Sequence, residues 1–575
     1  MASRKYLHIN LNSREVRSEQ LEGRALAEAG RYFIAKTLLA DGVATVEPLS
    51  ADNPLIFSAG PFAGTNFSNA NRLSVGCKSP LTGGIKESNA GGTFAIAMGQ
   101  LEIAGFTLNG QSDEWVIIRM TKDGEILFED ATPFMGKGNF DTAKLLHEKY
   151  GKKVSLAICG PVGEYEGLLS GIAISDADDR PVRIAARGGV GAVMGNKKVK
   201  AIVADKLKMP QFHDRRKVMD SIKEYGNALN AEQAIANFGK YGTAQVADLT
   251  NTIGGLPVRN FSAGRLVDPT QETLLVGGDH IQKLNSGRGG DTTHACMQGC
   301  LIKCSNVYVD EDGKEMVSPL EYETIGLMGT NCGLNHPDQI ARVNNIANDL
   351  GVDTIELGGV VGIMMDHGLG EFGDEQFMMD LMSDIMKGNE RGRILAQGAA
   401  RVGEHYGIKR VPVIKKQTIS AYDPRVVEVT GVSMMLTAQG ADHTVGNLPG
   451  FDCKGKTIEE LARQSYNVQL NSAIADSTGL CLFGRSVNDT HRQLLADAIN
   501  SAFDAGITPD FFLEIARDTL RFEAQFNEQA GFTEADDELP QFMLDEGLAP
   551  TNNKGRLHSA EVNKVMREII SQASA

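Results

Sequence analysis

The sequence predicts a mixed α/β (α+β) chain that is β-rich at its N-terminus and mainly helical after that. With 575 residues the chain is too long for one hydrophobic core, so several domains are expected. Strand-like stretches and Gly-rich turns fill the chain up to residue 208, and helical periodicity begins at Met209. A change of periodicity coincides with proline near Pro210 and Pro412, which predicts domains over residues 1–208, 209–411 and 412–575.

The clearest strand signal in the first part is a hairpin. Residues 115–120 and 125–128 are strand-like and flank Asp123-Gly124, a dipeptide typical of tight turns with positive φ.

In the later parts, two helices are predicted from their ends. One begins near Pro337 and ends at Gly351, and the other opens with a capping box of Thr457 and Glu460, so that Cys481 follows a helix. Apolar residues on one face of the first helix are Ile340, Val343, Ala347 and Leu350.

Charge excludes two classes of partner. Lys and Arg total 57 against 73 Asp and Glu, a formal net charge of -16, and such a surface repels nucleic-acid phosphates and anionic membranes. No apolar run reaches the roughly 20 residues of a membrane helix, and no secretion signal is visible. We therefore expect a cytoplasmic protein with no nucleic-acid or membrane partner.

Three of the eight cysteines fall at four-residue steps: Cys296, Cys300 and Cys304. Thiolates this close suit a soft metal or an iron–sulfur cluster, and Cys481 is a candidate fourth ligand. Three alternatives remain: a buried helical stripe of cysteines, a zinc site that recruits His294, and a radical-generating cluster with an open iron, whose usual spacing differs.

Two Gly-rich loops, residues 71–92 and 183–198, let backbone N–H groups approach phosphate oxygens. Positive charge for a polyanionic cofactor comes from Arg72, Lys78, Arg183 and Arg187. Neither loop has the dinucleotide or NTPase fingerprint, so a NAD dehydrogenase is not favoured, and tight β-turns are the alternative interpretation.

A carboxylate and an imidazole are candidates for proton transfer. Glu323 follows Tyr322 before an apolar run, and His443 stands among small residues. Considered alone, Glu323 could equally be a charge at the start of a helix, and His443 a hydrogen-bonded loop residue.

Nine segments occur in an order that resembles the aldehyde ferredoxin oxidoreductase family. They are HINLNSREV, KSPLTGGIKESNAGG, RGGVGAVMG, the cysteine cluster, EYETIGLMGTNCG, NDLGVDTIE, AYDPR, GADH and DSTGLC. The resemblance runs at least from residue 7 to residue 485. It implies a β-rich base of two sheets that cradles two pterins, two mainly helical domains, and an active centre between domains.

The resemblance also implies a cofactor set: one tungsten between two pterin dithiolenes (a tungstopterin), a [4Fe-4S] cluster and a magnesium ion that joins the pterin phosphates. Cluster ligands would be Cys296, Cys300, Cys304 and Cys481. Arg72 would bridge cluster and pterin, and Asn89 with Ile184 would offer carbonyls near magnesium. Other pterin contacts by motif position are Gly91, Arg183, Arg187, Asn348, Val352, Asp353, Asp476 and Leu480.

For activity, the resemblance implies oxidation of an aldehyde to a carboxylic acid. Glu323 would act as base and His443 as acid, with Tyr322 beside them. Electrons would pass through the cluster to a ferredoxin-like acceptor or an iron–sulfur electron-transfer subunit, in a homo- or hetero-oligomer that the sequence does not define.

The chain departs from the family pattern at several positions. The first gap of the cysteine triplet has three residues in place of two, so His294 stays an alternative ligand. In addition, Ala186 replaces a glycine and Asn348 replaces an aspartate. LTAQGADH, residues 436–443, replaces the usual stretch before the histidine. Two alternatives follow: another low-potential reaction, such as acid or aromatic reduction, or a cluster-only electron carrier without metal pterin.

Overall fold

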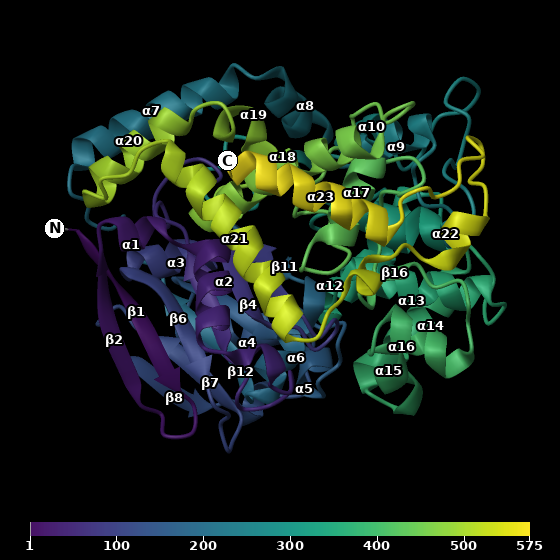
Figure 1. Ribbon diagram of the computed structural model, residues 1–575. Helices are drawn as coiled ribbons and strands as arrows, with labels where there is room; N and C mark the ends of the chain where they lie inside the picture. Colours follow the sequence, from purple (N-terminus) through teal and green to yellow (C-terminus); the bar gives the residue numbers. More distant parts are fainter. Residues whose placement is uncertain (1, 575) are drawn as a thin grey trace.

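The computed structural model describes residues 2–574 and confirms the mixed α/β class. Two β-sheets make up most of the N-terminal part, and helices dominate from α7 (Arg215–Asn230) onward. In Figure 1 the sheets, coloured purple to blue, lie at the lower left, and helices coloured from blue-teal through green to yellow lie above them and to their right.

The first sheet has the strand order β2-β1-β6-β3-β4-β5, so β5 is an edge strand. Helix α2 (Gly30–Ala40) packs on it so closely that a Cβ at Gly76 would lie 2.2 Å from Ile34. The strands are β1 (Ser3–Asn10), β2 (Val16–Glu22), β3 (Leu55–Ala59), β4 (Leu73–Lys78), β5 (Ile85–Ala90) and β6 (Ile103–Asn109).

The second sheet has the order β11-β10-β9-β12-β7-β8 and contains the predicted hairpin. Strands β7 and β8 pair antiparallel with Met120 opposite Ile126, as the Asp-Gly turn requires. The strands are β7 (Val116–Met120), β8 (Ile126–Asp130), β9 (Val154–Cys159), β10 (Ile172–Ile174), β11 (Arg183–Ala185) and β12 (Val199–Asp205).

One apolar core joins the two sheets. Phe57 and Phe106 from the first sheet and Ile202 from the second belong to it, together with buried residues of α3 (Phe94–Gln100) and α6 (Val190–Asn196). Because both sheets share this core, their edge strands are held in a defined relation, and β5 contacts β11. This junction of two sheet edges positions the candidate site.

Both predicted helix ends are confirmed. Helix α12 spans Pro337–Leu350 and stops at Gly351 with φ 72°, and α18 spans Ile458–Thr478 with the Thr457–Glu460 capping box formed. The other helices of the described residues are α1 (Arg24–Ala27), α4 (Asn139–Tyr150), α5 (Pro161–Glu164), α8 (Gln233–Tyr241), α9 (Gln245–Ile253), α10 (Gly278–Gly287), α11 (Tyr322–Thr324), α13 (Thr354–Asp366), α14 (Glu375–Lys387), α15 (Glu390–Leu395), α16 (Ala399–Tyr406), α17 (Glu428–Leu436), α19 (Arg485–Asn488), α20 (Arg492–Phe503), α21 (Asp510–Gln529), α22 (Gln541–Asp545) and α23 (Ser559–Ser574).

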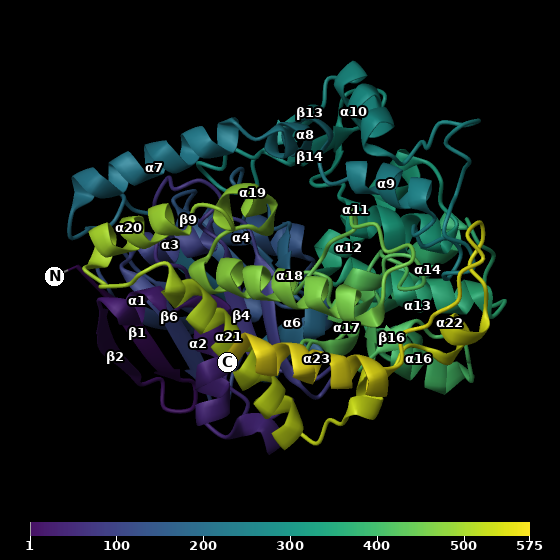
Figure 2. The ribbon, with the colours of Figure 1, turned by 45° about the horizontal axis from the view of Figure 1, so that its top comes forward.

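Short strands accompany the helices. Figure 2 shows β13 and β14 beside α8 and α10 at the top of the molecule. These strands are β13 (Asp291–His294), β14 (Ser305–Val309), β15 (Glu315–Val317), β16 (Val413–Ile414) and β17 (Gln417–Thr418).

The C-terminal part returns to the first sheet, since α21 packs along α2 (Figure 1). Arg31 of α2 donates two hydrogen bonds, of 2.7 and 2.8 Å, to the Glu523 carboxylate of α21, and both side chains are buried. A buried, bidentate pair is costly to break because either partner alone would be an unpaired buried charge. Among residues 2–574, no helix is long and apolar enough to cross a membrane.

Candidate functional site

The site forms where the edges of the two sheets meet. Strand β5 carries Asn89, and the Arg72 side chain bonds to it: Nε contacts the Asn89 side-chain oxygen and Nη2 donates to its carbonyl oxygen at 3.3 Å. Across the junction, β11 carries Arg183 and Ile184, and Ile184 is partly exposed. The two Gly-rich loops predicted to bind one polyanion therefore lie side by side, although they are far apart in sequence.

Arg187 is the most heavily bonded cation of this junction. Its guanidinium donates to the Asp353 carboxylate at 3.2 Å, to Ser420 Oγ at 3.0 Å, and to two backbone carbonyls, those of Thr418 and Ala441, at 2.6 Å each. Burial lowers the pKa of Arg187, but Asp353 and neighbouring carboxylates outweigh burial, so the pKa is raised. Arg187 is thus a fixed positive charge.

Two similar helix ends bring the predicted pterin motifs to this junction. After α12, Gly351 adopts φ 72° and Val352 N–H returns to Ala347 O at 3.3 Å; after α18, Gly479 adopts φ 71° and Leu480 N–H returns to Ala475 O at 2.9 Å. In both, a left-handed glycine lets the next apolar residue close the helix end. The Gly-Val and Gly-Leu dipeptides explain this geometry.

Each helix end is tied to one sheet. Asp353 N–H donates to Leu169 O at 2.9 Å next to the second sheet, whereas Arg72 N–H donates to Gly479 O at 3.0 Å next to the first. The carboxylate of Asp353 also caps α13 through Ile355 N–H at 2.9 Å. As a result, residues 348–353 and 476–481 are held on opposite sides of the sheet junction.

Asp476 lies in a crowded acidic environment. Burial and the nearby Glu87 carboxylate raise the pKa of Asp476 to about 8, even though Arg31 lies 3.4 Å from its Oδ2. The Asp476 carboxyl group therefore holds its proton more tightly than a solvated aspartate does.

Four thiols gather beside the junction. The loop between β13 and β14 carries Cys296, Cys300 and Cys304, and Cys481 follows α18; all four are free thiols. They are near enough for their charges to interact, and burial together with the neighbouring thiols raises the pKa of Cys300 to about 12. Four neighbouring free thiols, two of them buried and two partly exposed, suit a cluster that takes thiolate ligands.

The sulfur spacing also bears on the zinc alternative. Within residues 2–574, no three of these sulfurs lie within 4.8 Å of one another. Tetrahedral zinc with bonds of about 2.3 Å would hold its ligands closer together than that. The wider arrangement favours a multinuclear cluster.

His294 is engaged elsewhere. Its Nε2 lies 2.7 Å from Asp178 Oδ2, and Asp176 is the third member of this small group. Arg180 already pairs with Asp176 at 3.2 Å and with Asp178 at 2.7 Å, so these carboxylates have a cation. Cys296, in contrast, faces Gly91, where a Cβ would lie 3.1 Å from its Sγ. The geometry favours Cys296 over His294 as the fourth ligand.

Glu323 and His443 meet, as the acid–base prediction requires. Glu323 Oε1 lies 3.2 Å from His443 Nε2, and Glu323 Oε2 accepts a hydrogen bond from Ala421 N–H at 3.0 Å. Glu323 lies in α11, directly before a π-helical turn over Ile325–Gly329, and such turns are frequent at functional sites. Burial raises the pKa of Glu323 despite the opposing effect of His443.

On its other side, the His443 imidazole is held by Ser420. His443 Nδ1 lies 2.9 Å from Ser420 Oγ, which also accepts from Arg187. The Ser420 hydroxyl hydrogen has two acceptors within reach, Ala441 O at 3.4 Å and His443 Nδ1. Through these contacts Ser420 holds the imidazole in place beside Glu323.

Tyr322 contributes in a different way from Glu323 and His443. Its ring is buried, and its hydroxyl bonds to the Ala421 carbonyl and to Thr250 Oγ1, the latter at 2.9 Å. The hydroxyl therefore braces the Ala421 backbone, whose N–H holds Glu323, and has no direct path to the Glu323–His443 pair.

Several buried polar atoms of the site have no partner within the protein. Arg183 Nε and Asn348 Nδ2 are donors of this kind, and Glu323 Oε1 has no hydrogen bond. Buried donors without acceptors are unusual and indicate a missing acceptor-rich group. Together with the arginines and thiols, they fit an anionic cofactor and a cluster.

Some site residues were not predicted from the sequence. Ser420 directly precedes the AYDPR segment, and buried Lys86 donates to Asp442 Oδ2 at 2.5 Å. Lys86 and Glu87 are charges within an otherwise uncharged strand, and that pattern is a signal of buried pairing. Ser420 has no comparable signal.

Comparison with known proteins shows which family the chain belongs to. The N-terminal domain model of aldehyde ferredoxin oxidoreductase matches residues 6–206, and the model of its domains 2 and 3 matches residues 220–571. The tungsten-containing aldehyde ferredoxin oxidoreductase of Pyrococcus furiosus is 30% identical over 98% of this chain and 94% of its own length. The corresponding Thermococcus kodakarensis protein is 30% identical over 96% of this chain and 93% of its own length.

Two further proteins are similar to this chain at lower identity. The WOR-like subunit of an aliphatic sulfonate oxidoreductase from Pyrococcus furiosus is 24% identical over 88% of this chain and 83% of its own length. The active-site complex BamBC of benzoyl coenzyme A reductase shares the fold, with a TM-score of 0.82 at 18% identity over 99% of this chain and 95% of that chain. From the two domain models and the near full-length relatives, the chain belongs to the aldehyde ferredoxin oxidoreductase family of tungsten-containing oxidoreductases.

Proposed function

We propose that the chain oxidises an aldehyde to a carboxylic acid and passes the electrons through a [4Fe-4S] cluster to a ferredoxin-like acceptor. The observation that carries this proposal is the Glu323–His443 pair, 3.2 Å apart, near the Arg187 cation. Cys296 lies near Arg72 and Arg183 of the same sheet junction, and the 30% identity to tungsten-containing relatives supports the same activity.

In this proposal the chain holds its cofactors with the residues already described. Two pterin dithiolenes with one tungsten atom would supply the two-electron oxidation. Arg72, Arg183 and Arg187 would neutralise the pterin phosphates, and the Asn89 and Ile184 carbonyls would face a bridging magnesium ion. Further contacts would come from Gly91, Asn348, Val352, Asp353, Asp476 and Leu480, and cluster ligation from Cys296, Cys300, Cys304 and Cys481.

Glu323 acts as the base. Its Oε2 is fixed by Ala421 N–H, so Oε1 is the oxygen able to accept a proton from the water that adds to the carbonyl carbon. A buried carboxylate with a raised pKa is a stronger base than a solvated one, which suits this role.

His443 acts on the carbonyl oxygen. With Nδ1 bonded to Ser420, the Nε2–H is the donor that polarises the aldehyde oxygen when the substrate enters. Overall, one aldehyde and one water yield a carboxylate, three protons and two electrons. One-electron carriers must take those electrons in two steps. Tyr322 positions Ala421 and, through it, Glu323.

A second candidate is another low-potential reaction at the same site. The changed stretch 436–443 runs directly into His443, and a relative at 24% identity is named for an aliphatic sulfonate. Reduction of an acid or an aromatic compound would use the same proton-transfer pair, with electrons passing from the carrier to the substrate. A cluster-only carrier is the remaining alternative, and the unpartnered donors of Arg183 and Asn348 argue against it.

The test begins with element analysis of anaerobically purified protein. We expect about one tungsten and four irons per chain, as the family cofactors require, followed by oxidation of aldehydes with a viologen dye. Iron without tungsten or molybdenum would leave only the electron-carrier interpretation. A full metal content with no aldehyde oxidation, but with reduction of a carboxylic acid or an aromatic thioester, would favour the second candidate.

A further inference from the structure

We propose that the surface groove beside the cysteine loop is the docking site for an acidic iron–sulfur electron carrier, and that electrons leave through Cys300. This inference rests on the proposed function, because it names where the carrier of that reaction binds.

The groove reaches one of the thiols. A cavity of about 370 Å³ is lined by Cys300 and by its neighbours Gly299, Leu301 and Lys303. Cys300 itself is 6% exposed, whereas Leu301 is 40% exposed. Of the four thiols, Cys300 is the one that lines this cavity, so a protein seated in the groove would contact the loop that carries it.

The centre of the groove is apolar. Leu301 and Leu207, 40% and 42% exposed, both line this cavity and are among the few large apolar side chains that the described surface exposes. Leu207 and Lys206 also line a second cavity, of about 1020 Å³, so the two hollows adjoin and together form the groove. Exposed apolar residues surrounded by polar ones are typical of protein contact sites.

The rim of the groove carries uncompensated positive charge. Its two lining carboxylates are already paired, Glu102 with Arg4 at 3.8 Å and Asp205 with Arg119 at 2.5 Å. Within residues 2–574, five lining lysines make no ion pair: Lys122, Lys152, Lys153, Lys208 and Lys303. On a chain with a net charge of -16, this local excess of cations is unexpected by composition.

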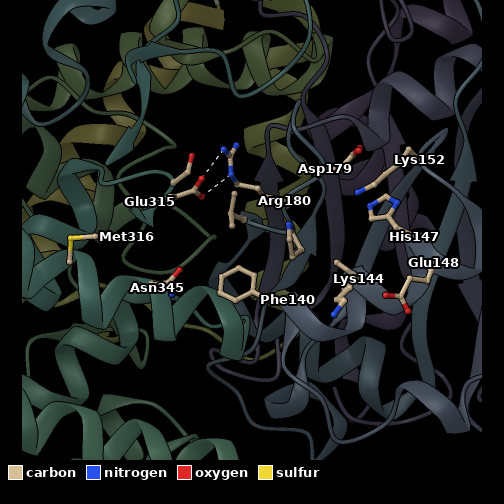
Figure 3. Close-up of a pocket in the computed structure, with 14 residues that line it drawn as sticks. Phe140, Lys144, His147, Glu148, Lys152, Asp179, Arg180, Glu315, Met316 and Asn345 are labelled. Carbon is tan, nitrogen blue, oxygen red and sulfur yellow. Dashed lines mark hydrogen bonds and ion pairs between the residues drawn. The ribbon is translucent and has the colours of Figure 1, made fainter. Parts of the chain in front are cut away.

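A neighbouring pocket shows that this excess is local. The pocket in Figure 3, about 610 Å³, has Lys144 and Lys152 on one wall with Glu148, and on the other wall Arg180 bonded to Glu315 at 2.8 and 3.0 Å. Asp179 also lines it, so its cations and anions are balanced. Lys152 lines both hollows, but carboxylates balance the cations of this pocket, whereas cations outnumber carboxylates in the groove.

An acidic partner complements this surface. Uncompensated lysines raise the association rate of a negatively charged protein, and the effect weakens as salt screens it over about 10 Å at 0.1 M. The two leucines would be desolvated at the centre while the lysines stay at the rim. An iron–sulfur protein with an acidic surface would thus be drawn to the groove that Cys300 lines.

The test uses the holoenzyme and a purified acidic two-[4Fe-4S] ferredoxin as the probe. A Lys208→Glu/Lys303→Glu variant should lower kcat/KM for the ferredoxin at least tenfold at 50 mM NaCl. The loss should shrink at 300 mM NaCl. Activity with benzyl viologen, which needs no docking surface, should stay within twofold. The matched control is Lys387→Glu/Lys409→Glu, which makes the same change in charge at exposed positions away from the groove.

Two results would overturn the docking proposal: an unchanged ferredoxin rate in the groove variant, or an equal loss in the control variant. Failure of the proposed function looks different, because the wild-type enzyme would then reduce no viologen with aldehyde. In that case ferredoxin binding, measured by titration calorimetry in the two variants, still decides the docking site. Iron content of each variant confirms that the cysteine loop is intact.

Discussion

Replacing Glu323 by glutamine is the sharpest test of the proposed proton transfer. Glutamine has the same shape, and its side-chain oxygen keeps the hydrogen bond from Ala421 N–H, which is 3.0 Å long in the native protein. What disappears is the charge and the proton acceptor 3.2 Å from His443 Nε2. Loss of a positioned general base lowers rates by about 10²–10⁴, which corresponds to roughly 2.7–5.4 kcal/mol of transition-state stabilisation.

The assay is kcat/KM for an aldehyde with a viologen acceptor, on protein of verified tungsten and iron content. Glu311→Gln is the control, since this carboxylate is 89% exposed and lies far from the pair. A Glu323→Gln enzyme with full metal content and native kcat/KM would refute the assignment of the base. A loss that tracks metal content would show a structural effect instead.

Stability gives an independent readout of the same substitution. The folded-state pKa of Glu323 is raised, so ionising it opposes folding. That penalty is fully present above the folded pKa and vanishes below the ordinary glutamate value. Glu323→Gln should therefore unfold at the same or a higher temperature than the native protein at neutral pH, and this difference should disappear in acid. Activity and stability would then change in opposite directions.

Three further substitutions test other parts of the site. Ser420→Ala should lower kcat about fivefold, the equivalent of one hydrogen bond of about 1 kcal/mol, and should shift the pH–rate profile. Ser420→Thr should restore both kcat and the profile. An unchanged profile in Ser420→Ala would show that Ser420 does not position His443. Cys481→Ser should reduce the iron bound per chain. Cys332→Ala should not, because burial alone raises the pKa of this buried thiol and no other thiol acts on it. Equal iron in both variants would exclude Cys481 as a ligand. At Gly479 φ is 71°, and the Cβ of an alanine would lie 3.0 Å from Gly60 Cα; at Gly407 φ is 68° and nothing lies within 4 Å. Gly479→Ala should therefore destabilise the protein by more than the roughly 1–2 kcal/mol expected for Gly407→Ala. Thermal unfolding that ranks the two variants in reverse would contradict the close packing of this helix end.

Local signals in the sequence were sufficient for much of the fold. The Asp123-Gly124 turn, the Thr457–Glu460 capping box and the stop at Gly351 each involve residues within a few positions of one another, and all three are confirmed. Such features depend on backbone geometry and short-range hydrogen bonds, which neighbouring residues determine. The three-domain division remains a prediction.

The long-range part of the site could not be obtained in the same way. That β5 and β11 are edge strands of two sheets, and that these edges meet, depends on the whole strand order and on the shared core. The engagement of the Tyr322 hydroxyl by Ala421 and Thr250 likewise depends on tertiary packing. Family resemblance placed Glu323 and His443 together, and only the structure shows that Ser420 orients the imidazole.

The dispersal of the four thiols along the chain has a consequence for biosynthesis. Cys296, Cys300 and Cys304 emerge from the ribosome long before Cys481, and at about 5–20 residues per second the intervening stretch takes roughly 10–40 s to make. In the proposed function, these three thiols are an incomplete ligand set during that interval. The set is complete only after Cys481, which follows α18, has been translated and α18 has packed against α2.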